Sequence, residues 1–153
     1  MEQIGHWING AHVAGTSGRT ADVWNPATGE VQAQVALASK AELDAAVADA
    51  AAAQPGWAAT NPQRRARVMM KFVSLLHRDM DKLAEALSRE HGKTIPDAKG
   101  DVIRGLEVAE FCIGAPHLLK GEYTDGAGPE IDMYSLRQPI GIAAGITPFN
   151  FPA

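Results

Sequence analysis

The fold class is decided by residues Ile140 to Thr147, which read Ile-Gly-Ile-Ala-Ala-Gly-Ile-Thr. A continuous apolar run of this length is typical of a parallel strand that is covered on both faces. Such a strand needs neighbouring strands and crossover helices, which would normally follow it in the sequence. Because the sequence ends at Ala153, we expect an α/β fold in truncated form, with this run as the first strand of an open sheet.

The residues upstream of this run predict a long helix. Thr94 is a helix cap with Pro96 in the first turn, and the helical pattern continues toward Pro116. The apolar stripe of this helix consists of Val102, Leu106, Ala109 and Ile113, while Arg104, Val108 and Phe111 gather on the opposite side. We therefore expect a helix that is buried on two faces. Glycine disfavours a helix interior, so Gly100 and Gly105 indicate a close backbone neighbour.

Extended structure is expected on both sides of the helical region. A glycine-rich polar connection over residues 121–129 precedes an alternating segment, 131–138, that predicts a strand. Near the start of the chain, Asn9-Gly10 predicts a hairpin because both residues tolerate positive φ. The turn signal Asn25-Pro26-Ala27-Thr28-Gly29 is followed by alternation over residues 30–36, which predicts another strand.

Helical signals occupy the region between these extended parts. Ser39 and Glu42 predict a capping box for the first helix, and Pro55-Gly56 is expected to end it. Asn61-Pro62 starts a second helix, and a related third helix carries the apolar spacing from Met80 onward. Gly92 is its predicted C-terminal stop.

The composition of the chain excludes several classes of protein. Of its 153 residues 46% are hydrophobic and 21% are charged, which argues against disorder, and a net charge of −4 disfavours nucleic-acid binding. Neither a signal peptide nor an apolar run long enough to cross a bilayer is visible, so we expect a cytoplasmic protein. The single cysteine, Cys112, excludes an internal disulfide, and the histidines lack the spacing of metal ligands.

Three collinear motifs resemble the aldehyde dehydrogenase superfamily. They are Asn25-Pro-Ala-Thr-Gly-Glu-Val31, Glu90-His-Gly-Lys-Thr94 and Thr147-Pro-Phe-Asn-Phe-Pro152. Three further stretches look like CoA-acylating methylmalonate-semialdehyde dehydrogenases: Ser17-Gly-Arg-Thr20, the helix from Asp97 to Phe111, and Ile131 to Pro139. The order and spacing of the three superfamily motifs over the whole chain make coincidence a poor explanation, whereas the resemblance to the acylating enzymes has a narrower base.

The resemblance implies the amino-terminal part of an aldehyde dehydrogenase fold, an α/β fold in which a helical segment precedes an open Rossmann-like NAD-binding sheet. Residues 1–120 are then part of the NAD-binding domain. Residues 121–139 form an oligomerisation hairpin, and 140–153 form the first strand and loop of the nucleotide-binding sheet. The catalytic domain is expected to be absent.

The resemblance also implies an activity. In such enzymes a cysteine thiolate attacks a semialdehyde, hydride passes to NAD, and coenzyme A releases propionyl-CoA or acetyl-CoA with loss of CO2. A succinate-semialdehyde or other acidic-aldehyde dehydrogenase is the alternative within the enzyme class. A non-catalytic assembly segment, which forms a homodimer or homotetramer through the hairpin, is the alternative outside it.

Asn150 matches the family asparagine whose side-chain amide supplies one donor of the oxyanion hole. The competing interpretation is an asparagine that only caps a turn before Pro152. Ile146, Thr147, Pro148 and Phe149 match the family loop that lines the nicotinamide half of NAD, although Ile146 and Phe149 also fit a role as core residues.

Arg104 matches a family arginine that binds the substrate carboxylate, for which a bidentate guanidinium suits the geometry. The alternative is an exposed ion pair with Asp101 or Glu107, worth at most about 0.5 kcal/mol. Cys112 is not expected to be the nucleophile, because it lies late in a helix between Phe111 and Ile113 with no feature that activates a thiol. We therefore expect the 153-residue segment alone to be inactive.

Overall fold

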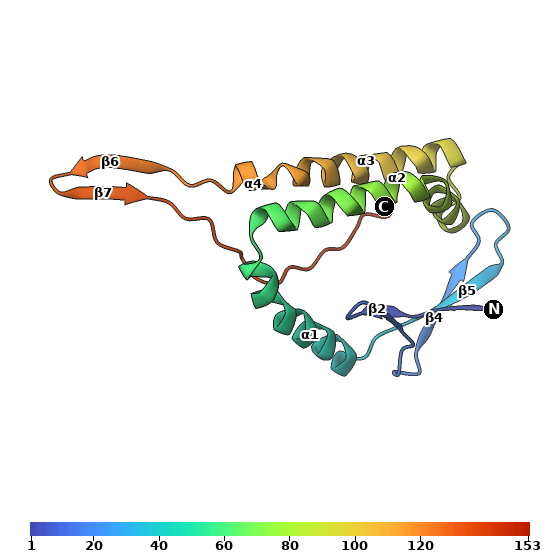
Figure 1. The fold of residues 1–153 in the computed structure, drawn as a ribbon. Helices are drawn as coiled ribbons and strands as arrows, with labels where there is room; N and C mark the ends of the chain where they lie inside the picture. The colour runs from blue at the N-terminus through green and yellow to red at the C-terminus, as the bar shows by residue number, and fades with distance from the viewer.

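A computed structural model describes residues 1–153. The strands are β1 (Glu2–Ile4), β2 (His6–Ile8), β3 (Ala11–Val13), β4 (Thr20–Trp24), β5 (Val31–Ala36), β6 (Tyr123–Gly128) and β7 (Ile131–Tyr134). The helices are α1 (Lys40–Ala59), α2 (Pro62–His91), α3 (Ile95–Ile113) and α4 (Ala115–Leu118). Small sheets lie at the start of the chain, α2 and α3 lie side by side, and a hairpin projects away from them (Figure 1).

The amino-terminal strands form two small sheets. In the first, β5 lies between β1, which is parallel to it, and β4, which is antiparallel. The second is the predicted hairpin of β2 and β3, confirmed with Asn9 at φ 51° and Gly10 at φ 74°. The turn at Asn25 is confirmed as well: the Gly29 N–H donates to the Asn25 carbonyl at 2.8 Å, and the predicted strand follows as β5.

Helix α1 begins as predicted but ends later than predicted. The capping box is present, with Ser39 as cap and Glu42 as its reciprocal acid. The expectation that Pro55-Gly56 ends the helix is wrong, because α1 continues to Ala59. A proline removes one helical N–H donor, here the partner of the Ala51 carbonyl. Since Ala51 is exposed to solvent, water can satisfy that carbonyl, and the surrounding alanines favour the helix.

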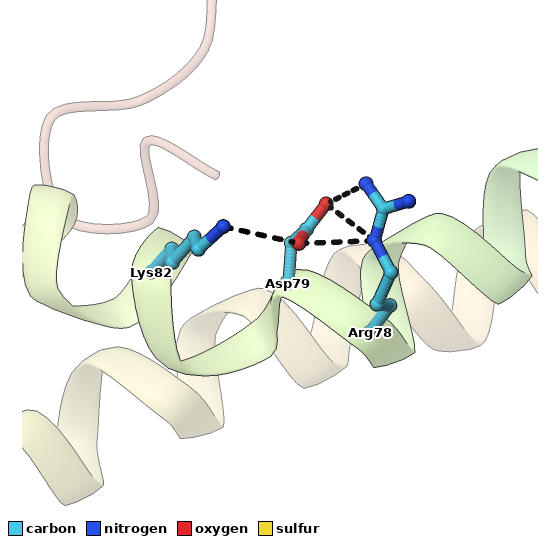
Figure 2. A network of polar contacts seen from close by, with 3 residues as sticks. All are labelled: Arg78, Asp79 and Lys82. Carbon is cyan, nitrogen blue, oxygen red and sulfur yellow. Dashed lines mark hydrogen bonds and ion pairs between the residues drawn. The ribbon is translucent and has the colours of Figure 1, made fainter.

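Helix α2 is a single helix of 30 residues where the sequence predicted two. Its cap is confirmed: the Asn61 side chain accepts from the Arg64 N–H at 2.9 Å. The residues at the expected break contain no glycine or proline, and Asp79 forms ion pairs there with Arg78 at 2.5 Å and Lys82 at 3.8 Å (Figure 2). The helix therefore continues until Gly92, which adopts φ 85° as the predicted stop.

Helices α2 and α3 pack side by side (Figure 1). Small and branched apolar side chains are buried on both helices. These buried residues are Ala66 and Ala84 on α2 and Ala98, Val102, Leu106 and Ala109 on α3. Burial on two faces is wrong for this structure, because Val108 and Phe111 on the opposite face are 63% and 68% exposed. A close backbone neighbour is confirmed at Gly105, where a Cβ would lie 3.6 Å from Ala153, but Gly100 has none.

The hairpin of β6 and β7 follows α4, with Tyr123 opposite Tyr134 and Gly128 opposite Ile131. The strand predicted over 131–138 ends at Tyr134, and the chain then returns toward the helices (Figure 1).

The strand predicted over Ile140–Thr147 is not formed in this structure. The run has no regular secondary structure, and Ile140 and Ile146 are 95% and 100% exposed. A strand requires hydrogen bonds to a neighbouring edge. No strand of the chain pairs with this run. The mixture of helices and sheets is as expected, but the only parallel pair joins β1 and β5.

Candidate functional site

The segment from Thr147 to Pro152 is held by the end of α2 and the residues that follow it. His91 Nε2 lies 2.9 Å from the carbonyl oxygen of Phe149. Lys93 Nζ donates to the carbonyl oxygen of Asn150 at 2.7 Å and stands 4.7 Å above the centre of the Phe151 ring. Two consecutive carbonyls and one aromatic ring are thereby fixed by two side chains that lie 57 or more residues earlier in the chain.

Gly92 is the local reason why both side chains reach this segment. Its φ of 85° ends α2, and its N–H donates to the Ser88 carbonyl at 2.8 Å. The Ser88 hydroxyl in turn donates to the Lys93 carbonyl at 2.6 Å, which fixes the backbone after the turn. A Cβ at Gly92 would lie 2.9 Å from Pro26 Cγ, so both conformation and space require glycine there.

Lys93 also forms a buried ion pair with Asp101 of α3. Lys93 Nζ lies 3.0 Å from Asp101 Oδ2, and the two side chains are 11% and 1% exposed. The other carboxylate oxygen, Asp101 Oδ1, is buried and has no hydrogen-bond partner. A carboxylate in such a place is tolerated because its charge is paired, and removal of one partner of a buried pair costs about 3–5 kcal/mol.

This pair is not among the contacts predicted from the sequence, where Asp101 is expected only as a surface partner of Arg104. The available signal was the position of Asp101 on the apolar stripe of α3, beside Ala98 and Val102. A charge on the buried face of a helix indicates a buried partner.

Asn150 lies in a turn that is closed by a backbone hydrogen bond, without any contribution from the Asn150 side chain. The Phe151 N–H donates to the Pro148 carbonyl at 3.3 Å, and the Asn150 side chain makes no hydrogen bond within the chain. The side-chain amide of Asn150 is therefore free to donate to another group, while the backbone carbonyl of Asn150 accepts from Lys93.

The other candidate residues are exposed. Ile146 and Phe149 are 100% and 90% exposed, and Thr147 and Phe149 line a cleft of about 570 Å³ with Ala86, Leu87, Glu90, His91 and Pro152. The cleft therefore combines apolar side chains with a carboxylate, an imidazole and a hydroxyl, and Ile146 does not line it.

Arg104 is exposed on α3, and its Nη1 lies 3.5 Å from Glu107 Oε2. Asp101, the other partner considered, is engaged with Lys93. The structure joins Arg104 to residues 147–152 through no hydrogen bond, although its neighbour Gly105 lies beside Ala153.

Cys112 lies elsewhere, half-buried near the end of α3, where it lines a groove of about 180 Å³ with apolar residues such as Trp57, Met69 and Pro116. No group of three or more metal-ligating side chains comes together in the structure. None of the helices combines the length and hydropathy needed to cross a bilayer.

Comparison with known proteins gives consistent matches. The model of the aldehyde dehydrogenase family matches residues 12–153. Malonate-semialdehyde dehydrogenase of Pseudomonas aeruginosa is 48% identical over the whole chain, which spans 31% of that protein. The acylating methylmalonate-semialdehyde dehydrogenase of Arabidopsis thaliana, a mitochondrial protein, is 45% identical over 99% of the chain and 25% of its own length. A crystal structure from Sinorhizobium meliloti, complexed with NAD, is 70% identical with a TM-score of 0.95 over 99% of this chain and 31% of that one.

Proposed function

Since the chain belongs to the aldehyde dehydrogenase family, we propose that it forms part of an NAD-dependent dehydrogenase that oxidises malonate or methylmalonate semialdehyde. The names of the similar proteins from P. aeruginosa and A. thaliana support this substrate class. The structural observation that carries the proposal is the free side-chain amide of Asn150 on a segment whose backbone is held on both sides.

Asn150 would act on the oxygen of the aldehyde. Nucleophilic attack on a carbonyl places negative charge on that oxygen, and a fixed amide N–H stabilises it without reorganisation. Loss of one such donor costs about 3 kcal/mol. The residues Ile146 to Phe149 would hold the nicotinamide ring, and NAD supplies the hydride acceptor. The NAD in the S. meliloti complex supports this assignment.

Arg104 would bind the carboxylate of the semialdehyde. Its side chain is 74% exposed and its contact with Glu107 is long, so a carboxylate can replace that partner at little cost.

Coenzyme A as the acyl acceptor, with loss of CO2 and release of propionyl-CoA or acetyl-CoA, rests on the acylating activity in the name of the A. thaliana protein. These names favour the malonate series over succinate semialdehyde.

The β6–β7 hairpin supports a second role, the assembly of a homodimer or homotetramer. Large apolar side chains are exposed on it, namely Tyr123, Ile131, Met133 and Tyr134. An isolated hairpin of this kind is marginally stable and its edges favour a partner. The cytoplasmic location expected from the sequence stays a prediction.

The test of the catalytic role uses Asn150→Ala in a dehydrogenase that contains this chain. We expect kcat to fall about 100- to 1,000-fold with little change in the KM for NAD, because the lost bond forms in the transition state. Gln63→Ala is the matched control, since it removes an exposed amide from α2. Unchanged kcat in Asn150→Ala would exclude the oxyanion role.

A further inference from the structure

We propose that Lys93, paired with Asp101, is the residue that positions Asn150, and that it does so through the Asn150 backbone. The inference rests on the proposed function, because it concerns the asparagine that would donate to the oxyanion. Lys93 itself need not touch substrate. Its ammonium group is already engaged with Asp101 Oδ2 at 3.0 Å and the Asn150 carbonyl at 2.7 Å.

The geometry of the peptide bond explains how a carbonyl contact directs a side chain. Each peptide group is planar, so a contact that restrains a carbonyl also restrains the whole plane to which it belongs. The Phe149 carbonyl, held by His91, belongs to the plane before the Asn150 Cα, and the Asn150 carbonyl, held by Lys93, belongs to the plane after it. With both planes restrained, φ and ψ of Asn150 are restrained, and so is the direction of its Cα–Cβ bond.

Lys93 is suited to this task because its own position is strongly constrained. Its backbone follows the Gly92 cap and its carbonyl accepts from Ser88. Its side chain is only 11% exposed, and its ammonium is fixed by a carboxylate that is 1% exposed on α3. The contact of the ammonium with the Phe151 ring restrains the residue after Asn150 as well.

A kinetic test separates positioning from general stability. In a dehydrogenase that contains this chain, Lys93→Met should lower kcat about 10- to 100-fold, since misplacement of a reacting group by about 1 Å costs this much. The double variant Lys93→Met/Asn150→Ala should be no slower than Asn150→Ala alone, because Lys93 acts through Asn150. Lys93→Arg should retain more activity than Lys93→Met. Lys99→Met is the matched control, a lysine of α3 in an exposed ion pair with Asp81.

The outcomes that overturn the proposal are specific. Multiplicative losses in the double variant would mean that Lys93 acts independently of Asn150. If Lys93→Met leaves Asp101 unpaired and the protein fails to fold, Lys93→Met/Asp101→Leu removes both charges and takes its place, since apolar replacement of a buried pair is often tolerated.

A readout without catalysis distinguishes failure of this inference from failure of the proposed function. The Phe151 amide closes the turn onto the Pro148 carbonyl. Hydrogen exchange of this amide should become about tenfold faster in Lys93→Met/Asp101→Leu, because a turn that Lys93 no longer holds opens more often. It should stay unchanged in Lys99→Met. Unchanged exchange would refute the positioning role, even if Asn150→Ala proves inactive. Faster exchange with a fully active Asn150→Ala would instead refute the oxyanion role alone.

Discussion

At the scale of single residues, solvent exposure separates two ion pairs that α3 contributes to. Lys93 and Asp101 are 11% and 1% exposed, whereas Arg104 and Glu107 are 74% and 57% exposed. An exposed pair contributes roughly 0–1 kcal/mol, and one with its atoms 3.5 Å apart belongs at the low end of that range. Arg104 can therefore be replaced with little effect on the fold, which makes its role in substrate binding testable.

Arg104→Leu should weaken the use of the acidic semialdehyde selectively. Hydrogen bonds to charged groups contribute roughly 1.5–3 kcal/mol, so kcat/KM should fall about 10- to 100-fold, mainly through KM. Propionaldehyde, which has no carboxylate, should be oxidised almost as well by the variant. Arg78→Leu, on α2, is the control for loss of an exposed arginine. Equal losses for both aldehydes at unchanged oligomeric state would mean that Arg104 is structural.

Replacement of Gly92 and of Gly100 by alanine should change the free energy of unfolding in opposite directions. Gly92→Ala places a Cβ at φ 85° and 2.9 Å from Pro26 Cγ, so the free energy of unfolding should fall by at least about 1–2 kcal/mol. Gly100 lies inside α3 with open space around it, so Gly100→Ala should raise that free energy by roughly 0.5–1 kcal/mol. Urea unfolding of a dehydrogenase that contains each variant chain measures these changes, and a stabilising Gly92→Ala would contradict the structure.

At the scale of elements, the residues that cap the helices could be predicted from the sequence, whereas the continuity of a helix through Pro55 or past Met80 could not. Ser39, Asn61 and Thr94 each cap the helix that the sequence assigned to them, because capping depends on a few adjacent residues. The continuation of α1 through Pro55 depends on solvent exposure, which local sequence does not encode. The unformed strand at 140–147 depends on a partner edge, which is a property of tertiary structure.

In the candidate site, too, features set by adjacent residues could be predicted and features set by tertiary contacts could not. Asn150 and residues 146–149 could be proposed from a motif that is contiguous in sequence. The contacts of His91 and Lys93 could not, since they join residues 57 or 58 positions apart. The burial of Asp101 could have been predicted from the helical periodicity of α3, but the identity of its partner, Lys93, could not.

Glu42 connects two elements and gives a prediction about pH. Its pKa is lowered from 4.5 to about 2, first by the Ser39 N–H and then by the Thr16 N–H, with further bonds from both hydroxyls. A carboxyl group whose pKa is lower in the folded state stabilises the fold above its unfolded pKa, and this contribution is lost as pH falls through the folded value.

The Glu42 contribution to stability should therefore be complete above about pH 4.5 and lost toward pH 2. A dehydrogenase that contains the wild-type chain should resist urea better than its Glu42→Gln variant at pH 6, and this difference in stability should disappear as the pH falls through that window. Glu85→Gln, an exposed carboxyl on α2, is the control. A gap of constant size between pH 6 and pH 2 would show that the carboxylate charge is not the cause.

At the scale of the whole molecule, the accessible surface is larger than a compact protein of this mass requires. The chain exposes 11411 Å² at 16.2 kDa, whereas a folded monomer of that mass exposes about 7,500 Å². Large apolar side chains are exposed on the projecting hairpin, on the outer face of α3 and along residues 140–149. On the proposed function, we expect the remainder of a dehydrogenase or a second subunit to cover these surfaces.

The last prediction concerns the 153-residue chain by itself. Only eight of its residues are buried, and burial of apolar surface is the main term that offsets the conformational entropy of folding. We therefore expect broad, weakly cooperative thermal unfolding by circular dichroism, strong binding of a hydrophobic dye, and no NADH production from a semialdehyde and CoA. A dehydrogenase that contains the chain is the control, and it should unfold sharply and bind little dye.

A sharp transition of the isolated chain, with sedimentation showing a monomer, would mean that the α2–α3 contact suffices for folding. NADH production would mean that Cys112, the only thiol available, acts as a nucleophile after all.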